Sequence, residues 1–464
     1  MTPIAATGDP PTLRAEALGF VESVIMGIAG SGPAYSVAAG TAVLIAAVGV
    51  LAPASLLYCG LIMMGIVLAF RHLNRLTVNA GASYAWVGAI FSPALGFFAG
   101  WAQIISSVVF MVAGTFPAAA ATLKLIAPGF ADSQTAVTVT AALWLVAIGA
   151  VVAKGIKLSG YVQVGFTLVE VGVLVLFFAI AAIGSAPQPA HTVAAVWFTG
   201  SGFTPALFAG GAAIALFAVS GWDVTANLNE ETRDGARIAG AGSIVSVVIV
   251  VLLLVGFCAL ALDLLSDAEI ERAGLNIVSV VAQKLMPHPW DYLAVIAVMT
   301  STIGTLETSI LQFTRTLYSM SRDRTLHPRY SRLHPVYRTP WVATLVITGL
   351  GLALLFGSLC LHGVKTVIDA SINAVGFQVA FYYGLAGLAC IWYFRTEALT
   401  GIGKFMLLLA WPLLGVGFCF GIAVYSVPTF NLTTNLLGAG SIAIGIVPYL
   451  WTRFAPARRI GLTG

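Results

Sequence analysis

Runs of about 20 apolar residues recur along the whole chain, and they constrain its fold more than any other feature. A helix of that length crosses a hydrocarbon core of about 30 Å. Of the 464 residues, 59% are hydrophobic and 9% are charged, whereas a soluble domain carries about 25% charged residues. Because backbone groups in lipid need internal partners, the runs are expected to be helices. The sequence therefore predicts an all-α polytopic membrane protein.

Twelve runs are long enough to cross a membrane, and short connections separate them. The expected spans are residues 17–42, 45–70, 93–123, 135–153, 158–184, 206–230, 238–262, 290–320, 341–360, 366–394, 402–425 and 434–453. This division leaves short tails at 1–16 and 454–464 and predicts no soluble domain. The first tail has none of the regions that define a cleaved signal peptide, so no cleaved leader is expected.

Lysine and arginine are unevenly distributed over the connections, and this asymmetry predicts the orientation. With the first tail in the cytoplasm, the outer segments hold only Lys124, Arg272, Lys284 and Lys365, which leaves 18 of the 22 basic residues inside. Cytoplasmic loops carry such an excess of positive charge. We therefore expect both termini in the cytoplasm of an integral protein of the cell membrane, the inner membrane in a bacterium.

Residues that would support catalysis or hold a cofactor are sparse. The five cysteines lie in or beside apolar runs without metal or redox spacing, as small packing residues do. The six histidines fall in loops or at span ends, and no His-Glu-x-x-His pair or phosphate-binding glycine loop occurs. The basic connection 321–340 is typical of a solvated loop. The sequence predicts no enzyme, cofactor, metal site or nucleic-acid partner. A channel is also not expected, because the sequence shows no repeated pore-lining element.

Two expected spans contain residues that interrupt helices. The first includes GIAGSGPAYS, with the sequence Gly-Ser-Gly-Pro at 30–33, and the sixth is interrupted at 219–221. Glycine and proline both disfavour a helix interior. An unwound segment in lipid must be buried or line a cavity, and paired interruptions in two halves indicate the binding site of a transporter with inverted repeats. Alternatively, the small residues only allow close helix packing.

Four stretches, taken in order and spacing, resemble the amino acid–polyamine–organocation (APC) superfamily of permeases. They are GIAGSGPAY, LNRLTVNAGASYAWVGAIFSPALGFFAGW, ALFAVSGWDVTANLNEET and TRTLYSMSRDRTLHP. The resemblance covers about residues 15–455 and implies the LeuT-type fold. That fold has a ten-helix core of two inverted five-helix repeats, here 17–184 and 206–394, in which helices one and six are discontinuous. Residues 402–453 would then supply two additional helices.

The resemblance also implies where a substrate binds. Members of the superfamily hold the α-amino and carboxyl groups of the substrate between the breaks of spans one and six, where half-helix ends and free backbone groups attract ions. Phe217 matches the position of a gating aromatic residue. Carried over to this chain, the substrate-binding residues are Ile28, Ala29, Gly30, Ser31, Gly32, Phe217, Ala218, Val219, Ser220, Gly221 and Trp222.

Two positions depart from the family pattern. Pro33 removes an N–H donor from the turn expected to bind a carboxylate, which favours an amine as the substrate. In the fifth span, many proton-coupled relatives have a lysine that takes the place of a sodium ion. This chain has Glu170 there, so the local charge is inverted.

Three acids lie deep in apolar spans that contain no equally deep lysine or arginine: Glu170, Asp223 and Glu307. An ionised acid at the bilayer centre costs at least roughly 2.5–3.5 kcal/mol, so such a residue faces the protein interior and has a use. We expect Glu170 and Glu307 to carry a coupled proton and Asp223 to contact the substrate. The alternative for the glutamates is a permanently protonated acid in the core.

Other polar residues complete the expected site. Gln103 in the third span and Asn373 in the tenth are further substrate-binding candidates, whereas Glu230 and Glu231 are expected at a solvated helix end. The sequence thus predicts a secondary transporter that imports an amino acid or organic amine, with a cationic amine or polyamine favoured and a proton as the coupled ion. A neutral amino acid, sodium coupling and exchange stay open, because hydroxyls at 300–309 could hold sodium.

Overall fold

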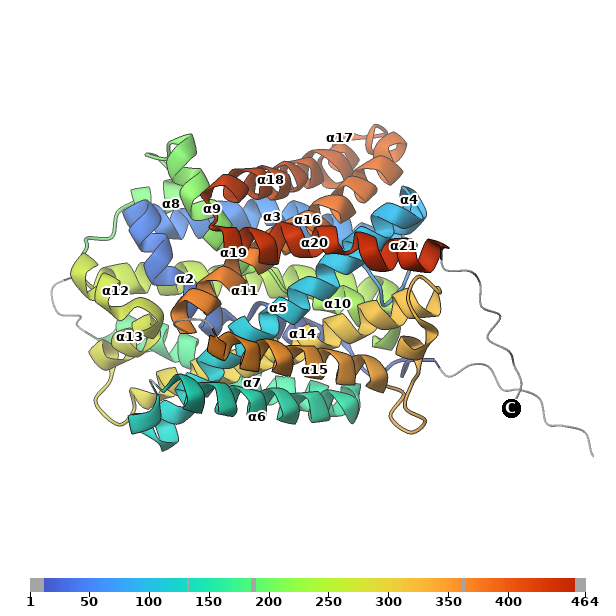
Figure 1. Cartoon of the computed structure of the whole chain (residues 1–464). Coiled ribbons are helices and arrows are strands. Elements are labelled where there is room, and N and C mark those ends of the chain that lie inside the picture. The colour runs from blue at the N-terminus through green and yellow to red at the C-terminus, as the bar shows by residue number, and fades with distance from the viewer. Residues whose placement is uncertain (1–11, 132, 185–188, 361–363, 455–464) are drawn as a thin grey trace, which may run out of the picture.

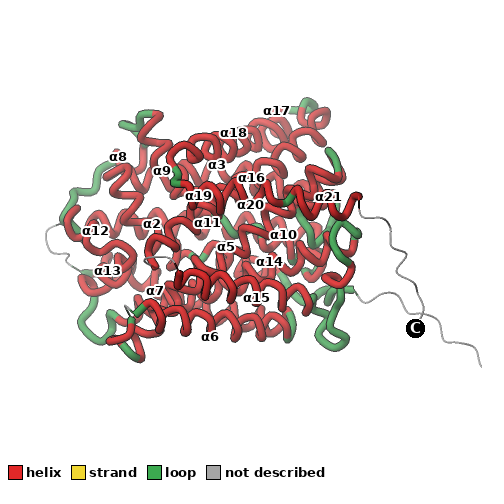
Figure 2. Tube along the Cα trace, in the orientation of Figure 1, coloured by secondary structure: helices red, strands yellow, loops and turns green. Residues whose placement is uncertain are grey.

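The protein is a bundle of long helices joined by short loops (Figure 2). A computed structural model describes residues 12–131, 133–184, 189–360 and 364–454. Within these ranges no β-strand forms, and the one strand-like contact is an isolated bridge between Leu18 and Thr232. The predicted all-α architecture is therefore confirmed.

The helices of the first half of the chain match most of the predicted runs. In order, they are α1 (Phe20–Ser31), α2 (Pro33–Val48), α3 (Ala52–Leu76), α4 (Ser83–Ile90), α5 (Pro93–Ile126), α6 (Gln134–Ala153), α7 (Ile156–Ile183), α8 (Val196–Thr199), α9 (Pro205–Val219) and α10 (Val224–Asn227).

The helices of the second half include the short segments of the outer loop and of the C-terminal part. They are α11 (Gly235–Leu264), α12 (Asp267–Ala273), α13 (Ile277–Leu285), α14 (Tyr292–Arg322), α15 (Trp341–Gly357), α16 (Val364–Ala398), α17 (Ile402–Phe405), α18 (Trp411–Ser426), α19 (Leu432–Asn435), α20 (Ser441–Ile444) and α21 (Ile446–Phe454).

Ten segments among the described residues are long and apolar enough to cross a membrane. One of them, Phe20–Leu76, has 57 residues and contains α1, α2 and α3, while α15 is apolar but shorter than the other candidates. At 1.5 Å per residue, a 57-residue segment is about 85 Å long if it is straight, so it is far longer than one crossing needs. The chain is an integral membrane protein.

The turn between the first two predicted spans was misplaced. The prediction ended the first span at residue 42 and began the second at 45, but α2 continues to Val48 and α3 begins only at Ala52. Gly49 ends α2 with φ 58°, a conformation that favours glycine. The turn lies inside an uninterrupted apolar run with no charged residue, so hydropathy alone could not locate it.

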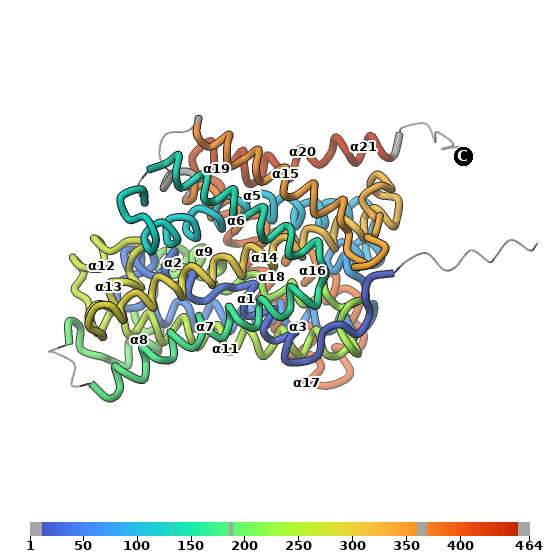
Figure 3. The backbone as a smooth tube through the Cα atoms, turned by 90° about the horizontal axis from the view of Figure 1, so that it is seen from below, coloured from blue at the N-terminus to red at the C-terminus, as the bar shows by residue number. Residues whose placement is uncertain are grey.

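The long helices run side by side, and α5 packs against both α14 and α16 in the interior (Figures 1 and 3). The short helices α8, α12 and α13 gather at one end of the bundle, at the left of Figure 1. The described chain begins and ends at the other end, where α1 starts and α21 finishes (Figure 3). The C-terminal helix α18 packs on α16 and α3.

Two helices are interrupted halfway across the bundle, as the sequence predicted. α1 ends at Ser31, Gly32 takes a left-handed conformation with φ 50°, and α2 resumes at Pro33. α9 ends at Val219, and the backbone is extended before the single turn α10 begins at Val224. Proline fits the first position of α2, because an N–H there has no partner within its helix.

Candidate functional site

The two helix breaks touch each other through their backbones. A Cβ atom added to Gly30 would overlap the carbonyl oxygen of Gly221, and a Cβ added to Gly221 would overlap that of Gly30. Gly221 also has φ 97°, which other residues rarely adopt. Glycine is therefore required on both sides of this contact, which brings the unwound segments together.

A small cavity lies beside this contact, between the breaks and three long helices. The first break and α2 form one wall, the second break another, and α5, α14 and α16 the rest. Among the described lining residues none is acidic or basic, and hydroxyl groups predominate. The lining consists of Gly30, Ser31, Tyr35, Ser36, Ser106, Ser107, Phe110, Phe217, Ser220, Gly221, Thr305, Ser309, Gln312, Val375, Val379 and Tyr382.

Several lining hydroxyls donate their proton to a backbone carbonyl. Ser220 Oγ donates to Phe217 O at 2.8 Å, Ser36 Oγ to Ser31 O at 2.7 Å, and Thr305 Oγ1 to Ala29 O at 3.0 Å. A hydroxyl that donates in this way keeps lone pairs that can accept from a ligand. The cavity is thus suited to a solute with hydrogen-bond donors and no net charge.

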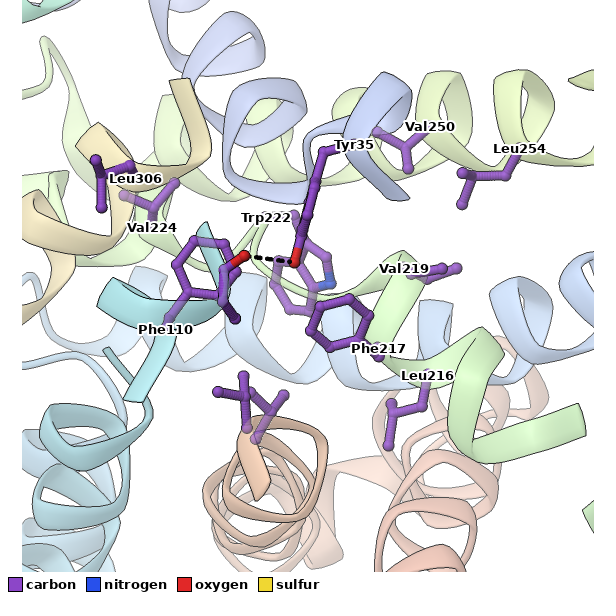
Figure 4. Close-up of a cluster of buried hydrophobic side chains, with 14 of the residues drawn as sticks. Tyr35, Phe110, Leu216, Phe217, Val219, Trp222, Val224, Val250, Leu254 and Leu306 are labelled. Carbon is purple, nitrogen blue, oxygen red and sulfur yellow. Dashed lines mark hydrogen bonds between the residues drawn. The ribbon is translucent and has the colours of Figure 1, made fainter. Parts of the chain in front are cut away.

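Three aromatic side chains that line the cavity pack together (Figure 4). The Tyr35 ring packs edge-on against Phe110, with 6.0 Å between ring centroids, and against Phe217, at 6.3 Å. Tyr35 also donates to Ala113 O at 3.3 Å, which fixes its orientation. Tyr35 lines a second, larger cavity that reaches Lys124, and Phe217 lines a third that contains Asn373. The central cavity therefore shares Tyr35 with one neighbouring cavity and Phe217 with the other.

Asp223 lies directly behind the cavity and is fully buried. Its Oδ1 accepts from Tyr383 OH at 2.6 Å. Its Oδ2 accepts from Gln312 at 2.6 Å, from Tyr382 OH at 3.0 Å and more weakly from Gln103 at 3.4 Å. These neutral donors satisfy an ionised carboxylate without a cation. Asp223 orients lining residues such as Gln312 and Tyr382, but it does not line the cavity itself.

Polar side chains continue from Asp223 toward the end of the bundle where the chain begins. Gln103 donates to Asn227 Oδ1 at 2.9 Å, and Asn227 donates to Ala80 O at 2.9 Å. Beyond them, Arg315 forms a two-bond ion pair with Glu231 at 2.8 and 3.0 Å, with both side chains buried. This network closes the bundle on that side of the cavity.

The expectation of a solvated helix end at Glu230 and Glu231 was wrong for Glu231. Its side chain is 1% exposed and pairs with Arg315 of α14, which is itself 0% exposed. Glu230 pairs with Arg322, also of α14, and accepts from Ala80 N at 2.9 Å. Long-range packing buries Glu231 and partly buries Glu230, because α14 runs alongside α10 and brings both arginines to them.

Glu170 lies on α7 at the start of α2. Its Oε2 accepts a long hydrogen bond, 3.5 Å, from Ala34 N, and the Ser301 hydroxyl lies beside it. Ser301 Oγ accepts from Tyr35 N at 3.0 Å. Pro33 has no N–H to offer a ligand. The next two backbone N–H groups of α2, those of Ala34 and Tyr35, donate to Glu170 and Ser301 and not to the cavity. The loss of a carboxylate-binding donor expected from Pro33 is consistent with this geometry.

Glu307 is the least satisfied acid among the described residues. Its side chain is 0% exposed, and neither carboxyl oxygen has a hydrogen-bond partner. The Ser159 hydroxyl lies against it without bonding geometry, and Gln163 leaves its Oε1 without a partner. Gln163 Nε2 instead donates to Gly304 O at 2.6 Å. Glu307 and Glu170 both lie on the interface of α7 and α14, outside the cavity.

The structure brings only part of the predicted binding set to the cavity. Gly30, Ser31, Phe217, Ser220 and Gly221 line it, as the breaks require. Asn373 is exposed and lies in the cavity beyond Phe217. The remaining predicted residues are buried behind the lining or in the breaks themselves: Ile28, Ala29, Gly32, Gln103, Ala218, Val219, Trp222 and Asp223.

Sequence reasoning missed several residues of the site. Ser106 and Ser107 form a hydroxyl pair inside an apolar helix, which was a usable signal. Tyr382 and Tyr383 stand together in FYYG, but nothing local indicates that they reach Asp223. Among the described residues no cluster of His, Cys, Asp or Glu has the arrangement of a metal site.

This arrangement defines a class of protein: a polytopic helical membrane protein with two broken helices around a small uncharged cavity. Residues 18–447 match the sequence profile of the family described as amino acid permease. The chain belongs to the amino acid permease family, which confirms the resemblance to APC permeases.

Three relatives illustrate how far this similarity extends. The serine/threonine exchanger SteT of Bacillus subtilis is 25% identical over 289 residues, which cover 61% of this chain and 63% of that protein. The branched-chain amino acid permease BcaP of Bacillus subtilis is 26% identical, with 74% of each chain covered. The uncharacterized transporter Rv1999c of Mycobacterium tuberculosis is 27% identical over 95% of this chain and 92% of its own. The first is named an exchanger, the second a permease and the third a transporter.

Proposed function

We propose that this protein is a secondary transporter that imports a small neutral amino acid by alternating access. The observation that carries the proposal is the uncharged, hydroxyl-lined cavity at the contact of two broken helices. Two barriers bound the cavity, the cluster of Tyr35, Phe110 and Phe217 on one side and the polar network behind Asp223 on the other. Opening one barrier at a time would move a bound solute across the membrane.

The cavity lining favours a neutral amino acid over the cationic amine expected from the sequence. A cation without a counter-charge in a buried site is costly, and no acid is found among the described residues that line this cavity. Asp223 was expected to attract the cation, but its oxygens already accept from tyrosine and glutamine donors. An amino acid carries both charges and no net charge. The names of two relatives also specify neutral amino acids, serine or threonine and the branched-chain residues.

A proton is the coupled ion that the geometry supports best. Sodium would need carbonyls of the first span together with hydroxyls of α14. Thr305 Oγ1 already donates to Ala29 O, and Ser301 Oγ accepts from Tyr35 N. Glu170 and Glu307 remain as buried acids that can gain and lose a proton. Exchange of two amino acids without a coupled ion is the second candidate, because one relative is named an exchanger.

The membrane arrangement is part of the same proposal. The 57-residue segment Phe20–Leu76 turns at Gly49, and counting it as two crossings and α15 as one brings the ten candidate spans to twelve. We propose ten core helices in two inverted repeats, two additional C-terminal helices, and both termini in the cytoplasm. The common end at which the described chain starts and finishes supports an even number of crossings (Figure 3).

Purified protein in liposomes tests the function. Vesicles loaded with unlabelled serine, threonine, valine or leucine should drive counterflow of the same labelled amino acid without an ion gradient. Cadaverine and agmatine should compete poorly. Competition by these amines alone would overturn the neutral substrate, and the absence of counterflow with every amino acid would overturn the function. An imposed pH gradient should then drive accumulation, whereas a sodium gradient should not.

A further inference from the structure

One face of α7 carries four buried polar residues that the substrate cavity does not use. Ser159, Gln163, Thr167 and Glu170 are spaced four, four and three residues apart, so they lie along one side of the helix. α7 packs against α14, and this face meets Ser301, Gly304 and Glu307. We call these seven residues the polar column. It follows the interface along which α7 and α14 pack against each other.

The polar column contains an acid whose oxygens receive no hydrogen bond, and several other side-chain oxygens that have no hydrogen-bond partner. Both oxygens of Glu307 lack partners, as do Gln163 Oε1, Ser159 Oγ and Thr167 Oγ1, although each of these side chains is at most 4% exposed. An ionised carboxylate buried without a donor or cation is very costly. A protonated Glu307 would instead donate to the adjacent Ser159 oxygen, and the unpartnered oxygen of Gln163 lies one turn away at Gly304. These groups therefore suit a bound proton.

Gly304 and Glu307 of the polar column lie on a different side of α14 from the substrate cavity, whereas Ser301 shares a face with the cavity-lining Thr305. Thr305, Ser309 and Gln312 line the cavity and share one face of that helix. Gly304 and Glu307 face α7, since Gly304 O accepts from Gln163 and Ser159 lies against Glu307. Among the described lining residues of the cavity none belongs to the column. A proton in the column would thus not occupy the substrate's space.

The charged side chains on α7, on α14 and on the elements that pack against them either pair with residues outside the polar column or lie away from it. Arg315 binds Glu231, Lys284 of α13 binds Glu269, and Glu22 of α1 accepts from Gly19 N. Asp223, beside α10, holds its own neutral donors. The remaining charged residues of these two helices and of the elements that pack on them lie at helix ends or in a short 3-10 helix: Lys124 on α5, Lys157 on α7, Arg237 and Asp263 on α11, Arg322 on α14, and Arg329 in the 3-10 helix Pro328–Ser331.

We propose that Glu307, Ser159 and Gln163 form a proton-binding site separate from the substrate cavity, and that the polar column passes this proton between Glu307 and Glu170. The proposal rests on the proposed transport function. In this step the O–H bond of Glu307 breaks and an O–H bond of Glu170 forms, so the negative charge moves from Glu170 to Glu307, and the reverse step restores both groups. Glu170 also touches the first turn of α2 through Ala34 N. Gain or loss of the proton there changes how the first helix break is held, which links the column to the cavity.

Glu307→Gln in liposomes separates this role from a structural one. Glutamine keeps the shape and carries its own donor, but it cannot release a proton. We expect counterflow, which needs no net proton movement, to stay within about twofold of the wild type. Accumulation driven by a pH gradient, and substrate-induced proton entry reported by a trapped pH dye, should fall at least about tenfold. Glu307→Asp, which keeps the acid, should retain part of both.

Ser159→Ala is a second test of the proposal, and it has a matched control variant. Ser55 is also a buried hydroxyl without a partner, but it lies on α3 against Gly211. Ser159→Ala should slow pH-driven accumulation several-fold with counterflow preserved, whereas Ser55→Ala should leave both unchanged. If Glu307→Gln loses counterflow as well, this pair decides the question.

Three results would overturn the proposal. One is undiminished pH-driven accumulation by Glu307→Gln, which would make the acid a structural, permanently protonated residue. Another is an equal effect of Ser159→Ala and Ser55→Ala. The third is accumulation that follows a sodium gradient in wild type and is lost in Glu307→Gln, which would make the column a cation site. Failure of wild-type counterflow would instead count against the transport function itself.

Discussion

Asp223 and Glu307 are both fully buried acids halfway across the same bundle, yet their surroundings are opposite. Asp223 has four neutral donors from α5, α14 and α16, whereas both oxygens of Glu307 lack a partner. The first environment is built to hold a charge and the second to hold a proton. Burial alone therefore says little about an acid in a membrane protein, and the count of donors decides its role.

Among the buried carboxylates, Glu231 should show the largest effect of losing its partner on the free energy of unfolding, because its partner, Arg315, carries a full opposite charge. Arg315→Met leaves Glu231 ionised and unpaired in a buried site, which should cost about 3–5 kcal/mol of the free energy of unfolding. Denaturation in mixed detergent micelles measures the loss. A variant as stable as the wild type would show that water reaches Glu231 and that the network is not a closed barrier.

Asp223→Asn should have the next largest effect, about 3 kcal/mol. The amide presents one acceptor and two donors to a cluster arranged to donate, so donors that served a charge lose their partner. Tyr383→Phe removes the 2.6 Å bond alone and should cost about half as much. The same denaturation assay compares the two variants. Equal stability of Asp223→Asn and wild type would mean that Asp223 is already protonated, and the contrast with Glu307 would disappear.

Glu307→Gln should change the free energy of unfolding by no more than about 0.5 kcal/mol. No donor is bonded to Glu307, so no bond is lost, and the new amide can donate to Ser159. Glu307→Leu is the harsher control and should also be tolerated in stability. A loss as large as that of Asp223→Asn would show that Glu307 carries a charge in the folded protein.

A partly exposed carboxylate at the protein surface should give the smallest effect, although it has a cation and a backbone N–H as partners. Glu269, in the short helix α12, pairs with Lys284 at 2.8 Å and caps Ser266 N, and these contacts lower its pKa from 4.5 to about 2. A lowered pKa stabilises the fold above pH 4.5 and the contribution is lost as the pH falls toward 2. Glu269→Gln should therefore shift Tm only slightly at pH 7 and not at all near pH 2. A large shift would show that solvent screening is weak at this surface.

The sequence predicted the features that depend on local chemistry. The Gly-Ser-Gly-Pro segment at 30–33 and the interruption at 219–221 broke the helices where expected, because glycine and proline act on their own backbone. The depth of Glu170 and Glu307 followed from the length of the apolar runs. The family followed from four short stretches, and its profile covers 18–447.

Features that depend on distant residues could not be predicted in the same way. The donors of Asp223 lie 89 to 160 residues away in sequence from it, so the acid looked unpaired and suggested a cationic substrate. The partner of Glu231 lies 84 residues away, which hid a buried ion pair behind an apparently solvated helix end. Asn373 was chosen for its polarity within the tenth span, but its position along α16 places it beyond Phe217.

The contact between Gly30 and Gly221 has a consequence for how such a protein can change over time. Each glycine excludes a side chain on the other through a backbone oxygen, and a backbone oxygen cannot be trimmed by mutation. A larger residue at either position therefore has no compensating substitution at its partner. Lineages that retain this arrangement are expected to vary freely in the residues that select a substrate while both glycines stay fixed.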